Sequence, residues 1–76
     1  MNPEEIRKRV RKNILKLRKK YGISRKSLAK LVHISEEQLR RIDNGDVDAK
    51  LYDFHLKRIG EVFDIRIDML FQDEMQ

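Results

Sequence analysis

Apolar residues in the first third of the chain recur at the spacing of one amphipathic helix. They stand three or four positions apart, which places them on a single stripe of a helix with about 3.6 residues per turn. Asn2 precedes Pro3 and stands three residues before Glu5, a pattern typical of a helix N-terminus with Asn2 as the N-cap. Gly22 is expected to end the helix, because glycine tolerates the left-handed conformation that follows many helices. The stripe consists of Ile6, Val10, Ile14, Leu17 and Tyr21.

Residues 24 to 45 predict two short helices joined by a tight turn. Ser24 is expected to cap a helix from about residue 25 to residue 31, and Ser35 a second helix from about residue 36 to residue 43. Gln38 stands where its side chain would complete a capping box with Ser35, and Gly45 is placed to end the second helix. The inward positions are Leu28, Ala29 and Leu31 or Val32 in the first helix, and Leu39 and Ile42 in the second.

Residues 48 to 72 predict the C-terminal helices. Asp48 is expected to cap a fourth helix, and a final short helix follows it. Strand-type alternation of apolar and polar residues is absent, and the connections between the helical segments are short. The sequence therefore predicts an all-α fold, a single compact domain of five helices over residues 1 to 76. The inward residues are Tyr52, Leu56, Ile59 and Phe63 in the fourth helix and Ile67, Leu70 and Phe71 in the last.

The net charge of +5 conceals a strong asymmetry along the chain. Residues 1 to 32 carry twelve Lys and Arg against two Glu, a balance of +10, while residues 33 to 76 carry six basic and eleven acidic residues, a balance of −5. A positive field favours a polyanionic partner, because each neutralised phosphate releases condensed counterions. Charge alone also fits a helix face that only keeps the protein soluble.

The sequence offers little for catalysis. It has no cysteine, and neither His33 nor His55 has an evident third partner for a metal site or a catalytic triad. Glycine patterns of phosphate loops and dinucleotide sites are absent. We therefore expect no enzymatic activity, no cofactor, no metal and no small-molecule ligand. No apolar run approaches the ~20 residues that span a bilayer, and the acidic start is unlike a secretory signal, so we expect a cytoplasmic protein without membrane contact.

Four residues of the predicted helix pair share the spacing of a known DNA-binding motif. A small residue, Ala29, is followed by His33 in the turn and then by the apolar Leu39 and Ile42. This spacing resembles the helix-turn-helix of the Cro and lambda-repressor-like (Xre-type) regulators, and the similarity covers nearly the whole chain. It implies a lambda-repressor-like domain that binds double-stranded DNA. The wider match comprises Leu17-Arg18, Gly22-Ile23-Ser24, Leu28-Ala29, Ile34-Ser35, Ile42-Asp43-Asn44-Gly45 and Phe63-Asp64-Ile65.

The chain departs from the family pattern in the turn and after the second helix of the pair. His33 stands where the family usually has glycine, so it has to accept a left-handed conformation at a cost of roughly 1 kcal/mol or reshape the turn. The loop after Gly45 is longer than usual, and Asp46 and Asp48 stand where related proteins often have basic residues.

The resemblance implies roles for individual residues. It places the second helix of the pair in the major groove, where arginine reads guanine and glutamine pairs with adenine. Glu36 and Glu37 have a second interpretation, since acids in the first turn also stabilise a helix through its dipole. The candidates for base contacts are Arg40, Arg41, Gln38, Glu37 and Glu36; those for phosphate contacts are Arg25, Lys26 and Asn44; and Arg18 and Asp43 are expected to form a partly buried ion pair.

The apolar C-terminal segment suggests a homodimer. The segment from Ile65 to Met75 holds more apolar residues than one short helix can bury, and Ile67, Phe71 and Met75 are the expected interface residues. The alternative is that Ile65, Leu70 and Phe71 simply close the core of a monomer. A two-fold dimer places its recognition helices about 34 Å apart and matches a palindromic operator. We expect sequence-specific binding by a small transcriptional regulator, a repressor by resemblance. The alternatives are a helix-turn-helix that binds a protein partner instead, and a basic first helix that binds RNA or a membrane surface.

Overall fold

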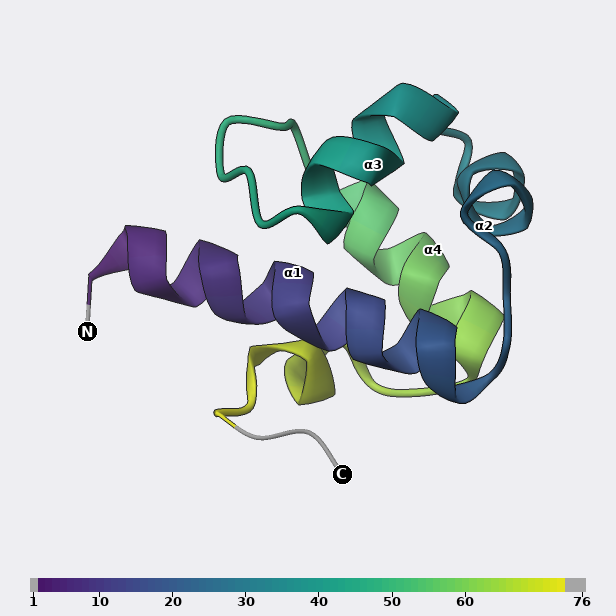
Figure 1. The fold of residues 1–76 in the computed structure, drawn as a ribbon. Helices are drawn as coiled ribbons and strands as arrows, with labels where there is room; N and C mark the ends of the chain where they lie inside the picture. Colours follow the sequence, from purple (N-terminus) through teal and green to yellow (C-terminus); the bar gives the residue numbers. More distant parts are fainter. Residues whose placement is uncertain (1, 74–76) are drawn as a thin grey trace.

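The computed structural model describes residues 2–73, which form four α-helices and one short 3-10 helix (Figure 1). Residues 2–73 contain no strand, and the predicted all-α fold is confirmed. In Figure 1, α1 runs across the molecule, α2 and α3 lie on one side of it and η1 on the other. The elements are α1 (Pro3–Lys20), α2 (Arg25–Val32), α3 (Glu36–Asp43), α4 (Asp53–Phe63) and η1 (Ile67–Phe71).

Local capping fixes the bounds of the first helix. The Asn2 side chain accepts a hydrogen bond from the Glu5 N–H at 2.8 Å, and Gly22 after the helix has a φ of 65°, as the sequence predicts. Val10, Ile14 and Leu17 of the apolar stripe are buried. Tyr21 is not, because it lies past the last helical turn, where its ring contacts Phe63 at 5.7 Å between centroids and stays 53% exposed.

The helix pair has the predicted bounds to within a residue. Ser24 Oγ accepts from the Ser27 N–H at 3.1 Å, and Ser35 Oγ from the Gln38 N–H at 3.0 Å, so serine caps both helices. His33 adopts the left-handed conformation, with φ 65° and ψ 42°, and therefore accepts backbone strain that a glycine in the turn would avoid. Ala29 is buried, and its small side chain permits close packing of α2 in the core.

The prediction that Asp48 caps the fourth helix is wrong. The α4 helix begins at Asp53 with Tyr52 as its N-cap, and the ring nitrogen Nδ1 of His55 accepts from the Tyr52 N–H at 3.0 Å. Asp48 lies in a loop instead, and its N–H donates to Asp46 Oδ1 at 2.9 Å. Tyr52, expected inside, consequently projects from the helix start and is 49% exposed.

The core lies between α1 and the other four elements. Asn13 of α1 joins it to the C-terminal segment, because its Nδ2 donates to the carbonyls of Leu70 at 2.8 Å and Gln72 at 2.9 Å. Of the apolar residues expected inside the last helix, only Leu70 is buried, while Ile67 and Phe71 are 36% and 40% exposed. Met69 of the same short 3-10 helix packs against the core and is partly buried. The core residues are Val10, Ile14, Leu17, Leu28, Ala29, Val32, Leu39, Ile42, Ala49, Leu56, Ile59, Phe63 and Leu70.

Candidate nucleic-acid interface

The outer side of α3, which we call the recognition face, carries most of the residues expected to contact bases. Leu39 and Ile42 are 1% and 0% exposed and hold the other side of this short helix in the core. Side chains on the opposite side of the helix must therefore point away from the core. The recognition face consists of Glu36, Glu37, Arg40, Arg41 and Asn44.

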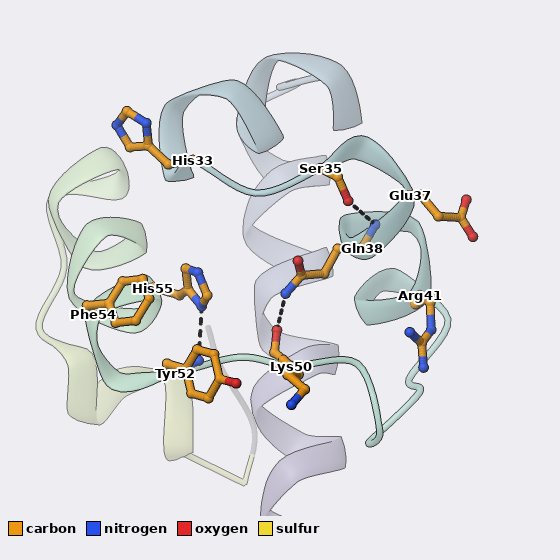
Figure 2. A pocket seen from close by; sticks show the side chains of 9 residues that line it. All are labelled: His33, Ser35, Glu37, Gln38, Arg41, Lys50, Tyr52, Phe54 and His55. Carbon is orange, nitrogen blue, oxygen red and sulfur yellow. Dashed lines mark hydrogen bonds between the residues drawn. The ribbon is translucent and has the colours of Figure 1, made fainter.

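Gln38 does not belong to this face. Its backbone N–H satisfies the Ser35 cap, and its side-chain amide donates across a gap to the carbonyl of Lys50, as Figure 2 shows. The side chain is therefore engaged with the loop before α4. Of the two hydrogen bonds of the expected capping box, only the one from the Gln38 N–H to Ser35 Oγ is present. The Gln38 side chain instead bonds to the Lys50 carbonyl.

Arg41 lies against a carboxylate of the loop that follows α3. Its Nε is 2.8 Å from Asp46 Oδ2, and the side chain remains 42% exposed. Asp46 also accepts from the Asp48 N–H, and this bond together with the Arg41 hydrogen bond lowers the pKa of the Asp46 carboxyl. Within residues 2–73, neither terminal guanidinium nitrogen of Arg41 has a hydrogen-bond partner.

Arg40 pairs within its own helix. Its Nε donates to Glu37 Oε2 at 2.9 Å, its Nη2 bonds to the other carboxylate oxygen, and the two side chains are 46% and 66% exposed. The hydrogen bond from Arg40 lowers the pKa of the Glu37 carboxyl. Exposed pairs three residues apart on a helix contribute little to stability. Glu36, in the first turn, is also exposed.

Asp43 joins three helices at the inner edge of the recognition face. Its Oδ2 lies 2.8 Å from Arg18 Nη2 of α1 and 3.0 Å from Arg25 Nε of α2, while the Asp43 side chain is only 2% exposed. The Arg18–Asp43 pair implied by the resemblance is thus present, and Arg25 joins it. Arg25 keeps 37% of its side chain exposed, which leaves part of its guanidinium accessible for a phosphate.

The remaining phosphate candidates lie at the two ends of the helix pair. Lys26, in the first turn of α2, is exposed, and Asn44 is the exposed C-cap of α3. Five of the residues that sequence reasoning assigned to DNA therefore have solvent-accessible side chains on the helix pair: Arg25, Lys26, Arg40, Arg41 and Asn44.

Arg11 of α1 is buried although it is charged. The residue is 4% exposed, and its guanidinium donates to the carbonyls of Asp46 at 2.9 Å and Ala49 at 2.7 Å. Burial, followed by the neighbouring charge of Arg7, lowers the pKa of Arg11. Its role is to hold the loop of residues 46–49 against α1. The only sequence signal was a long loop whose carbonyls needed donors.

An aromatic hollow of about 550 Å³ lies between α3 and the start of α4 (Figure 2). Tyr52 and Phe54 stack at 5.7 Å between ring centroids and are 49% and 66% exposed. The hollow adjoins the recognition face, since Glu37 and Arg41 contribute to its lining. Sequence reasoning missed this surface because it placed Tyr52 inside the core.

Comparison with known proteins identifies the family. The family model described as "Helix-turn-helix domain" matches residues 5–74, and the chain belongs to this family. No curated protein and no solved structure matches the chain. Membership supports DNA as the partner, in agreement with the surface position of the arginines on α3. None of the helices in residues 2–73 is long and apolar enough to cross a membrane.

Proposed function

We propose that the chain binds double-stranded DNA sequence-specifically, as a small transcriptional regulator of the Cro and lambda-repressor-like kind, most simply a repressor in the cytoplasm. The observation that carries this proposal is the outward projection of Arg40 and Arg41 from the second helix of the pair, fixed by the buried Leu39 and Ile42 on its other side. Arginine donates two hydrogen bonds to O6 and N7 of guanine, which gives it specificity in the major groove.

Phosphate contacts would orient the domain on the duplex. Arg25 and Lys26 stand in the first turn of α2, and Asn44 follows the last turn of α3, so these residues flank the proposed base-reading surface on two sides. Contacts to phosphates fix the register of a protein on DNA without reading the sequence.

Dimerisation through the C-terminal segment is the second part of the proposal. Ile67 and Phe71 are partly exposed apolar side chains of η1, and a second copy of the chain would cover them. Met75, also expected at this interface, lies outside the described residues. A two-fold pair of domains would favour a palindromic operator.

Selection from a random pool of duplexes tests this function directly. We expect enrichment of a palindromic sequence, tighter binding to it than to a scrambled duplex, and an affinity that falls steeply as salt rises. Uniform binding of all duplexes, or no binding, would contradict the proposal. The aromatic hollow gives the competing function its support, because exposed Tyr52 and Phe54 suit a protein partner. That function predicts that no duplex is enriched.

A further inference from the structure

Arg40 and Arg41 are neighbours in sequence, but their carboxylate partners are held very differently. Glu37, the partner of Arg40, is an exposed side chain of the same helix. Asp46, the partner of Arg41, belongs to a loop that is fastened to the core. A carboxylate that is anchored to the core holds its arginine in one orientation. An exposed carboxylate is free to change rotamer, so it constrains its arginine less.

Asp46 is fixed at two points besides its contact with Arg41. Its Oδ1 accepts from the Asp48 N–H at 2.9 Å, and its backbone carbonyl accepts from Nε of the buried Arg11 at 2.9 Å. Arg11 in turn reaches the Ala49 carbonyl at 2.7 Å. The carboxylate position is therefore set by the core helix α1 through Arg11, and the hydrogen bonds from the Asp48 N–H and Arg41 lower the pKa of Asp46.

We infer that Asp46 is a positioning residue that orients Arg41 for reading a guanine, an inference that rests on the proposed DNA-binding function. Asp46 engages only Nε, which leaves the two terminal nitrogens of Arg41 as a pair of parallel donors. This edge matches the O6 and N7 acceptors of guanine. Because Asp46 constrains the guanidinium before DNA arrives, less side-chain entropy is lost on binding.

The same carboxylate also acts against DNA in general. A negative charge beside the recognition face repels every phosphate backbone, whatever the base sequence. Asp46 therefore strengthens binding to a site with the correct guanine and weakens binding to all other sites. Both effects raise the ratio of specific to non-specific affinity.

The test compares Asp46→Asn with a matched control, Asp68→Asn. Asparagine keeps an oxygen for the Asp48 N–H but loses the charge that holds Arg41. Asp68 forms an exposed pair with Arg66, also at 2.8 Å, on η1 and away from α3. Each variant is titrated against the selected duplex and against a scrambled one, after thermal melting has shown how far it is folded at the titration temperature.

For Asp46→Asn we expect specific affinity to fall by about fivefold and non-specific affinity to rise by about twofold, so that their ratio falls by roughly tenfold. Asp68→Asn should leave the ratio unchanged, provided that gel filtration shows the same oligomeric state as the wild type, because η1 also carries the proposed dimer contacts. Replacing the contacted guanine by 7-deazaguanine, which lacks the N7 acceptor, should cost the wild type more than Asp46→Asn. A merely structural role would lower both affinities together and leave the guanine effect intact, which would overturn the inference.

Two failures remain distinguishable in this design. A wild type that binds every duplex alike overturns the proposed function and this inference with it. A selective wild type whose affinity ratio is the same as that of Asp46→Asn overturns only the role of Asp46. If Asp46→Asn is not folded, Asp46→Glu, which keeps the charge but displaces it, replaces it in the same comparison.

Discussion

The outer faces of α3 and α1 both carry basic side chains, but their charges are arranged differently. Each arginine of the recognition face lies against a carboxylate, Arg40 against Glu37 and Arg41 against Asp46. On α1, Lys12, Lys16 and Lys19 stand on the side opposite the buried stripe and form no ion pair with residues 2–73.

This difference suggests separate roles in DNA binding: the unpaired lysines would attract any DNA, and the paired arginines would contact particular bases. Unpaired lysines create a field that draws in any polyanion over the Debye length, about 8 to 10 Å at moderate salt. Paired arginines contribute less to that field, and they bind bases only where acceptors fit. The large positive balance of the first 32 residues therefore predicts that DNA is attracted. Under the proposed function, we expect the groups around Asp46 and Glu37 to determine which DNA sequence is preferred.

The largest expected effect comes from removing the buried carboxylate behind the recognition face. Asp43→Ala leaves Arg18 and Arg25 without their partner, and breaking such a pair should lower the free energy of unfolding by about 3 kcal/mol. Urea denaturation measures this loss. Asp68→Ala, which breaks an exposed pair, should cost less than about 1 kcal/mol, and equal losses in the two variants would contradict this view of Asp43.

The next effect concerns DNA affinity and distinguishes Arg41, a proposed base contact, from Arg25, a proposed phosphate contact. Arg41→Ala should weaken binding to the selected duplex by about 1 to 3 kcal/mol and affect a scrambled duplex much less. Arg25→Ala should weaken both and reduce the salt slope by about one unit, because a phosphate contact releases counterions on every sequence. Fluorescence titrations at several salt concentrations measure both. If the two variants behave alike, the assignment of base and phosphate contacts is wrong.

A smaller effect on the rate of DNA association is expected from the unpaired lysines of α1. A triple variant, Lys12→Gln with Lys16→Gln and Lys19→Gln, should slow association with DNA at low salt and leave the ratio of specific to non-specific affinity unchanged. Stopped-flow kinetics measure this, and the difference from wild type should shrink as salt screens the field. A changed affinity ratio would show that these lysines take part in recognition.

The smallest effect is a dependence of stability on pH through His55, next to the aromatic hollow. Burial lowers the pKa of His55 below its ordinary 6.5, and its neutral ring accepts the Tyr52 N–H. The stabilising contribution is therefore complete above pH 6.5 and declines as pH falls below it, because the unfolded chain binds the proton more readily. Thermal melting between neutral and mildly acidic pH shows the decline. The decline in stability should persist in His33→Gln. If it disappears in that variant, the pH dependence belongs to His33 in the turn and not to His55.

Local signals predicted the first half of the fold well. The caps at Asn2, Ser24 and Ser35 are hydrogen bonds between residues three apart, so the sequence alone contains both partners. The predicted cap at Asp48 was wrong because the loop is shaped by Arg11, which lies more than thirty residues earlier and donates to its carbonyls. No local pattern contains that contact.

The candidate site was predictable in outline and not in its pairing. Helical periodicity places Arg40 and Arg41 outward once Leu39 and Ile42 are taken as buried. It does not show that Asp46 meets Arg41, because the backbone between them leaves the helix at Asn44 and depends on the conformation of the loop. Gln38 illustrates the same limit, since its partner is a loop carbonyl.

The hydrogen bonds of Asn13 have a practical consequence for building larger proteins from this one. They fasten the backbone of Leu70 and Gln72 to the middle of α1, and Arg9 holds Asp73 nearby at 2.6 Å. A domain fused after this segment would start next to α1, on the side of the fold opposite α3 in Figure 1. Fusion partners attached there should leave the arginine-bearing surface accessible.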